Sequence, residues 1–182
     1  MPADLSPLIA ATAQWLTRAY PAGGGALDSA LGEAQARQAV TVAAWLRYPT
    51  ATDAALVGMA GPGGSDRLDG VTGTEMAVYE TGDDGDGTDA YAWRTWVDEV
   101  VASWAASLLG DPDLAALAVA ALADGEHLGG APVEFRRLVA PDERDVRAAP
   151  LLRHPDLLAP VADLHRAGLF DRLRPGRHVT AS

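Results

Sequence analysis

The stretch DAYAWRTWVDEVVASWAASLLG, residues 89–110, carries the strongest helical pattern in this chain. Its bulky apolar residues recur every three or four positions, as they do along one face of an amphipathic helix. They are Trp93, Trp96, Val97, Val100, Val101, Trp104 and Leu108. Asp89 stands where a helix cap is expected, while Asp98, Ser103 and Ser107 fall on the opposite face. The pattern therefore predicts a helix over 89–110 whose tryptophans form the centre of the core.

Cap and proline signals divide the rest of the chain into further helices. Ser6 precedes Pro7 at the first helix, and Asp111-Pro112 opens the helix that follows residue 110. The predicted helices cover about 6–19, 27–47, 52–60 and 111–124, with shorter segments at 132–139, 141–148 and 155–167. Pro160 is expected to split the last of these segments. The predicted fold class is all-α, an irregular helical bundle.

A glycine-rich segment interrupts this pattern at about 58–88. Nine of the chain's 19 glycines fall between Gly58 and Gly87. We expect an irregular loop here, holding at most one short strand or hairpin, for which Glu75–Glu80 is the candidate. The predicted organisation is one helical domain over 1–173, with the 58–88 loop as an insertion, followed by a loose tail at 174–182.

The composition excludes several kinds of chemistry. All 14 basic residues are arginine and there is no cysteine, so a Schiff-base lysine, a thiolate nucleophile and a cysteine-ligated metal are ruled out. The net charge of −11 is uneven, because residues 1–130 hold 5 Arg and 18 Asp or Glu, whereas residues 131–182 hold 9 Arg and 7 acids. No apolar run approaches the roughly 18 residues of a membrane span. We expect a cytoplasmic protein that does not enter the membrane.

One acidic run is a candidate cation site. Asp83, Asp84, Asp86 and Asp89 offer oxygen ligands of the kind that calcium or magnesium prefers. The spacing fails the EF-hand pattern, because an aspartate stands where that loop needs a glycine. The alternative is a solvated acidic turn beside a helix start. No other cofactor is expected.

Asp124, Glu126 and His127 follow the helix predicted at 111–124 and could form an acid–base cluster. The alternative is an ordinary surface loop between two glycine signals. No histidine in the chain has the partner spacing of a zinc-binding helix. These three residues would carry the chemistry if the protein were an enzyme.

A second set of residues suggests an interaction surface. Trp45 sits beside another bulky apolar residue near the end of its predicted helix, so one of the pair must face outward or into a neighbour. Phe135, Arg136, Arg137 and Arg144 form an arginine-rich segment, although interleaved acids argue against nucleic-acid binding. The predicted function is a non-catalytic interaction module, or a subunit of a larger assembly, that binds a protein or itself. The alternative is an enzyme or a small-ligand or metal-binding domain with the 58–88 loop as its lid.

Overall fold

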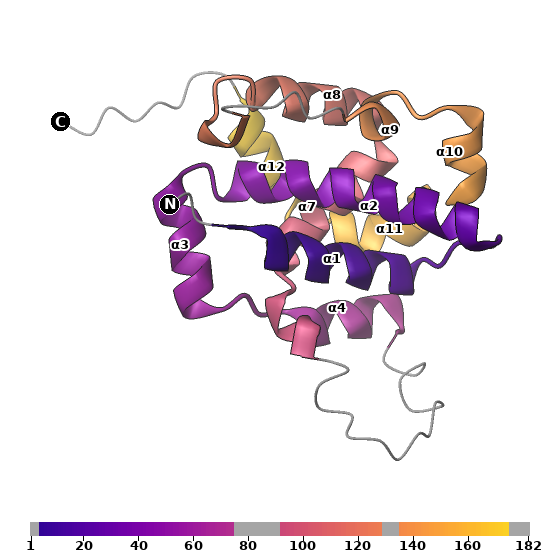
Figure 1. Ribbon diagram of the computed structural model, residues 1–182, viewed down its shortest axis with the longest axis horizontal. Coiled ribbons are helices and arrows are strands. Elements are labelled where there is room, and N and C mark those ends of the chain that lie inside the picture. The colour runs from indigo at the N-terminus through magenta and orange to yellow at the C-terminus, as the bar shows by residue number, and fades with distance from the viewer. Residues whose placement is uncertain (1–3, 75–91, 129–134, 175–182) are drawn as a thin grey trace, which may run out of the picture.

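The computed structural model describes residues 4–74, 92–128 and 135–174 (Figure 1). Within these ranges every regular element is a helix, which confirms the all-α prediction. The first half contains α1 (Ser6–Ala19), α2 (Ala26–Arg47), α3 (Ala51–Ala60), α4 (Ser65–Thr72) and the 3₁₀ helix η1 (Ala92–Trp96). The second half contains α7 (Glu99–Gly110), α8 (Pro112–Ala121), η2 (Glu126–Leu128), α9 (Arg136–Val139), α10 (Glu143–Ala148), α11 (Pro155–Ala162) and α12 (Arg166–Leu173).

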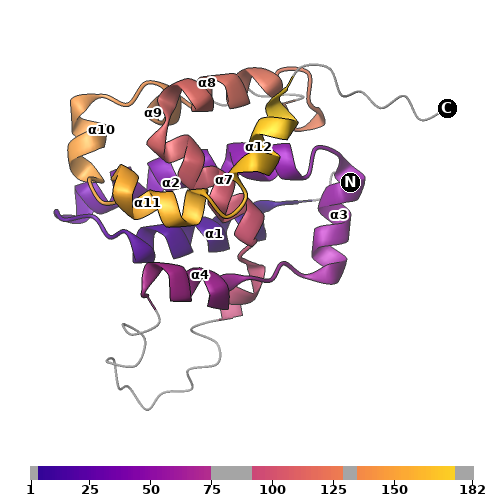
Figure 2. The same ribbon diagram turned by 180° about the vertical axis from the view of Figure 1, so that it is seen from behind.

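The central helix of the bundle is α7. It packs against α2 on one side and against α11 and α12 on the other, as the two opposite views show (Figures 1 and 2). Residues 101–109 are all buried, so this helix has no solvent-facing side over those positions. The prediction that Ser103 and Ser107 face outward is therefore wrong. Their hydroxyls donate hydrogen bonds to the carbonyls of Ala162 at 2.8 Å and of Ser103 at 3.1 Å, respectively.

The predicted helix over 89–110 is wrong at its start, because α7 begins at Glu99. Asp98, assigned to a polar outer face, is buried and caps the helix instead. Its Oδ1 accepts the backbone N–H groups of Val100 at 2.8 Å and Val101 at 3.2 Å, and Tyr48 donates its hydroxyl to Oδ2. The first N–H groups of a helix have no partner within it, and an aspartate that accepts them marks a helix start. The apolar run is therefore interrupted at Asp98, and α7 begins after it. The proposed cap Asp89 lies outside the described residues.

The tryptophans do not form one central stripe. Trp93 and Trp96 are half-buried at the edge of the core, whereas Trp15 of α1 and Trp104 of α7 are only 1% and 6% exposed. The Trp15 indole N–H donates to Asp69 Oδ1 at 2.9 Å. This buried pair joins α1 to α4.

Part of the segment predicted as an irregular loop is helical. Within 58–88, α3 continues to residue 60 and α4 occupies residues 65–72. Gly64 and Gly73 bound α4 with φ of 111° and 70°, a left-handed conformation that suits glycine. Leu68 is fully buried and holds α4 against the bundle. The candidate strand Glu75–Glu80 lies outside the described residues.

The C-terminal helices differ from the prediction in where they break. Pro160 lies inside α11, which continues to Ala162, so the expected split at this proline is wrong. Proline has no N–H, so the carbonyl of Asp156 lacks the helical hydrogen bond that residue 160 would otherwise donate. Asp156 lies in the exposed first turn of α11, where water can donate to this carbonyl instead. The chain breaks at 163–165 instead, before α12. Of the predicted tail, 175–182 lies outside the described residues.

Candidate functional site

Trp45 and His127, predicted for two different roles, lie side by side. Trp45 is in the last turn of α2 and His127 is in η2. Their rings stack, with centroids 5.5 Å apart and planes 12° apart. Phe135 meets Trp45 edge to face at 6.0 Å and 85°. Phe135 is 5% exposed and belongs to the core, so it supports Trp45 from within.

The imidazole of His127 is held by the residue that follows α2. Its Nε2 lies 2.6 Å from the carbonyl oxygen of Tyr48. Because a carbonyl can only accept, Nε2 carries the proton, and Nδ1 is the acceptor in the neutral ring. The neighbouring Glu126 accepts the backbone N–H of Ala51 at 3.1 Å. These two bonds fasten η2 to the connection between α2 and α3.

A hollow of about 720 Å³ opens beside the Trp45 ring, and we call it the Trp45 hollow. Three helices contribute the residues at their C-terminal ends: α2, α8 and α12. Figure 1 shows these three ends gathered on the same side of the molecule. The apolar lining residues are Trp45, Leu46, Pro49, Leu117, Ala121, Leu122, Gly125 and Leu173, and the polar ones are Asp124, His127, Asp171, Arg172 and Arg174.

The lining combines exposed apolar surface with charges of both signs. Leu117 of α8 is 64% exposed. Arg174 donates to Asp171 at 3.0 Å, so these two charges pair with each other. Arg172 and Asp124 are exposed and make no ion pair within the described part of the chain. No local pattern marks Leu117 or Leu173 as site residues, because a hollow between helix ends depends on how the helices are assembled.

The three acid–base candidates are not assembled into a cluster. His127 and Asp124 line the same hollow, but no hydrogen bond joins them among the described residues. The carboxylate of Glu126 is already used by a backbone N–H. The predicted metal ligands Asp83, Asp84, Asp86 and Asp89 lie outside the described residues. In the ranges that are described, no three histidine, aspartate or glutamate side chains gather to hold a metal ion.

Two arginines of the arginine-rich segment form ion pairs within the molecule. Arg137 donates to Asp145, whose side chain is fully buried, and Arg136 Nη2 lies 3.8 Å from the same carboxylate. Arg136 also reaches Asp142 at 3.4 Å. Arg144 is exposed on α10. None of these three arginines lines the Trp45 hollow.

Beneath this segment lies a buried polar network that joins α2 to the C-terminal helices. The Nε2 of Gln35 donates to the backbone carbonyl of Asp145 at 2.8 Å, and Arg153 donates through Nε to Gln35. Arg153 Nη1 also donates to the carbonyl of Leu109 at 3.1 Å. Burial lowers the pKa of the Arg153 guanidinium from its ordinary value, and the charge of Asp145 opposes that shift. The network is structural, because its groups satisfy one another.

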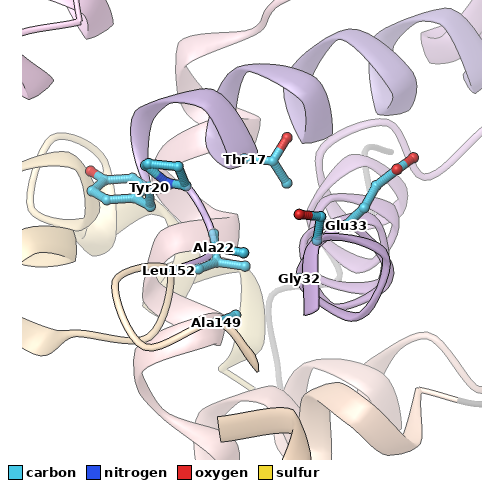
Figure 3. Close-up of a pocket in the computed structure, with 9 residues that line it drawn as sticks. Thr17, Tyr20, Ala22, Gly32, Glu33, Ala149 and Leu152 are labelled. Carbon is cyan, nitrogen blue, oxygen red and sulfur yellow. The ribbon is translucent and has the colours of Figure 1, made fainter. Parts of the chain in front are cut away.

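A second hollow, of about 270 Å³, lies between the end of α1 and α2 (Figure 3). Three of its four polar side chains are already engaged, and the exposed Ser29 hydroxyl makes no hydrogen bond with the described residues. Thr17 donates to the carbonyls of its own helix, Glu33 pairs with Arg37 at 2.8 Å, and Tyr20 donates to the carbonyl of Leu157 at 3.1 Å. This hollow therefore offers a ligand fewer free groups than the Trp45 hollow.

Comparisons of this chain with protein-family models, with curated proteins and with solved structures found no match. Across the residues that the structure describes, no helix combines the length and the apolar character that a bilayer crossing requires.

Proposed function

We propose that this chain is a non-catalytic protein-interaction module that binds a partner peptide in the Trp45 hollow. The observation that carries the proposal is the Trp45 ring itself, half-buried in the wall of an open hollow and braced by His127 and Phe135. Large aromatic side chains in such positions dominate the binding energy of many interfaces. A ring that is already fixed loses little conformational entropy when a partner binds.

The indole N–H of Trp45 also supports peptide binding. The indole N–H groups of Trp15 and Trp104 donate to Asp69 and to the carbonyl of His165. The Trp45 N–H has no such partner among the described residues. An indole N–H usually finds an acceptor when it becomes buried, and a backbone carbonyl of a bound peptide would supply one.

The apolar lining supports a side chain rather than a charged small molecule as the main occupant. Leu117 presents most of its side chain to solvent beside Trp45, and the lining holds more apolar than polar residues. Burying such surface is favourable by about 25 cal/mol per Å². A bulky side chain of a peptide can cover Leu117 and Trp45 together.

The competing function is binding of a small ligand, with or without catalysis. The volume of the hollow lies within the range of roughly 300–1,000 Å³ that is typical of ligand sites. Against it, the one imidazole that lines the hollow is tied through Nε2 to Tyr48, and the described carboxylates do not bond to it. Chemistry would need groups that act together, so we favour the interaction module.

A peptide-display selection on the immobilised protein tests the proposal. Peptides that bind are then measured against Leu117→Asp and against the matched control Leu56→Asp, which changes a 53% exposed leucine on α3. We expect Leu117→Asp to weaken binding by about tenfold or more, equivalent to ~1.4 kcal/mol, and the control to leave it nearly unchanged. Both sites are exposed, so circular dichroism should show an intact fold. Equal affinities for the two variants would contradict the proposal.

A further inference from the structure

The Trp45 hollow has an electrostatic polarity that its side chains alone do not show. The C-terminal end of a helix leaves up to four carbonyls unpaired and carries about half a negative charge. Three such ends, those of α2, α8 and α12, line the hollow. α2 and α12 carry Arg47 and Arg172 in their last turns, whereas α8 has no basic residue there. The uncompensated end is therefore that of α8.

Two acceptors at the end of α8 are unused. The carbonyl of Ala121 receives no hydrogen bond from the described residues, and the exposed carboxylate of Asp124 has no ion-pair partner among them. Both residues line the hollow. The nearby Arg174 is already paired with Asp171. This leaves free acceptors on one side of the hollow.

We infer that the peptide bound in the Trp45 hollow inserts a basic side chain, arginine or lysine, whose charged group meets Asp124 and the Ala121 carbonyl. This inference rests on the proposed function. The methylene stem of such a side chain covers apolar surface while its head stays polar, which matches the wall of Trp45, Leu117 and Leu122 beside the acceptors. An arginine in addition offers several N–H donors for a carboxylate and a carbonyl together.

The net charge of the whole molecule, −11, also favours a basic partner. Residues 1–130, which contribute most of the hollow, hold 5 Arg against 18 Asp or Glu. A negative surface attracts basic peptides over the distance of the screening length, about 8–10 Å at ordinary salt. Association should therefore slow as salt is raised, while the apolar part of the contact is kept.

The selected peptides supply the test. Each is measured by fluorescence anisotropy against the wild-type protein, Asp124→Asn and the control Asp113→Asn, which changes an exposed carboxylate at the other end of α8. We expect one basic residue to recur among the peptides. Its replacement by glutamine, or the change Asp124→Asn, should weaken binding about threefold to fivefold, as for an exposed ion pair of ~0.7–1 kcal/mol. Asp113→Asn should have no such effect.

The outcomes separate this inference from the function on which it rests. Peptides that need Leu117 but lack a recurring basic residue, and bind Asp124→Asn as tightly as wild type, would overturn the inference and leave the interaction module in place. A selection without any Leu117-dependent peptide would overturn both. Binding that weakens equally in Asp124→Asn and Asp113→Asn reflects net charge alone and also overturns the inference.

Discussion

Replacing Asp145 with alanine should lower the free energy of unfolding by about 3 kcal/mol, because this carboxylate is the buried centre of the arginine-rich segment. Its side chain is 0% exposed and accepts from Arg137. It also accepts the backbone N–H of Asp142 at 3.3 Å, and with that residue forms the capping box of α10. The substitution removes both interactions together.

The magnitude follows from these contacts. A hydrogen bond between charged groups contributes about 1.5–3 kcal/mol, and loss of a helix cap costs about 1 kcal/mol. Arg136 is 52% exposed and adds little, because solvent screens its pair with Asp145. Arg137, at 32% exposed, can turn towards water and recover part of the loss. The half-buried guanidinium of Arg153, however, loses a compensating negative charge.

Urea unfolding followed by far-ultraviolet circular dichroism at pH 7 measures the change. The control is Asp163→Ala, which removes a pair with Arg166 in which the side chains are 65% and 46% exposed, and which should cost less than ~0.5 kcal/mol. The loss in Asp145→Ala should persist in 1 M salt, since a buried pair is screened little. A loss below about 1 kcal/mol, or one that disappears in salt, would refute this reasoning.

Two further predictions concern buried polar groups. Trp15→Phe keeps an aromatic ring but removes the hydrogen-bond donor to the buried Asp69, so the free energy of unfolding in urea should fall by about 1–3 kcal/mol. The control is Trp96→Phe, at a half-buried site. Equal losses in the two variants would count against the reasoning. Burial raises the pKa of Tyr20 from 10.0 to about 12, so the unfolded state loses this proton first as the pH rises. The stability linked to Tyr20 is complete below pH 10 and is lost towards pH 12. Urea midpoints between pH 8 and 12 should fall less in Tyr20→Phe than in wild type, and parallel curves would exclude the effect.

Local signals were sufficient to predict the fold class and several helix starts. α8 and α11 begin at Pro112 and Pro155, where a proline can occupy the first turn without losing a bond. Asp98 shows the limit of such signals. A single aspartate inside an apolar run suggests a surface residue, whereas Asp98 is buried and its second carboxylate oxygen accepts a hydrogen bond from Tyr48, fifty residues away.

The candidate site was predictable only in its separate parts. Trp45 and His127 were both selected from the sequence, but for different functions, and nothing in their spacing indicates that their rings stack. The hollow that both residues line depends on where three helices end in space. Helix ends that are far apart in the chain meet through tertiary packing, and local periodicity predicts secondary structure but not that packing. For the same reason Leu117 could not be recognised as exposed.

The burial of α7 on all sides has a consequence for synthesis. Ser103 accepts the backbone N–H of His165 at 3.0 Å and donates to the carbonyl of Ala162, contacts that span about sixty residues of chain. A ribosome releases α7 well before it releases α11 and α12, so the growing chain exposes an apolar helix face until residues near 169 have emerged. During that interval we expect the exposed apolar face of α7 to be open to chaperones that bind apolar segments.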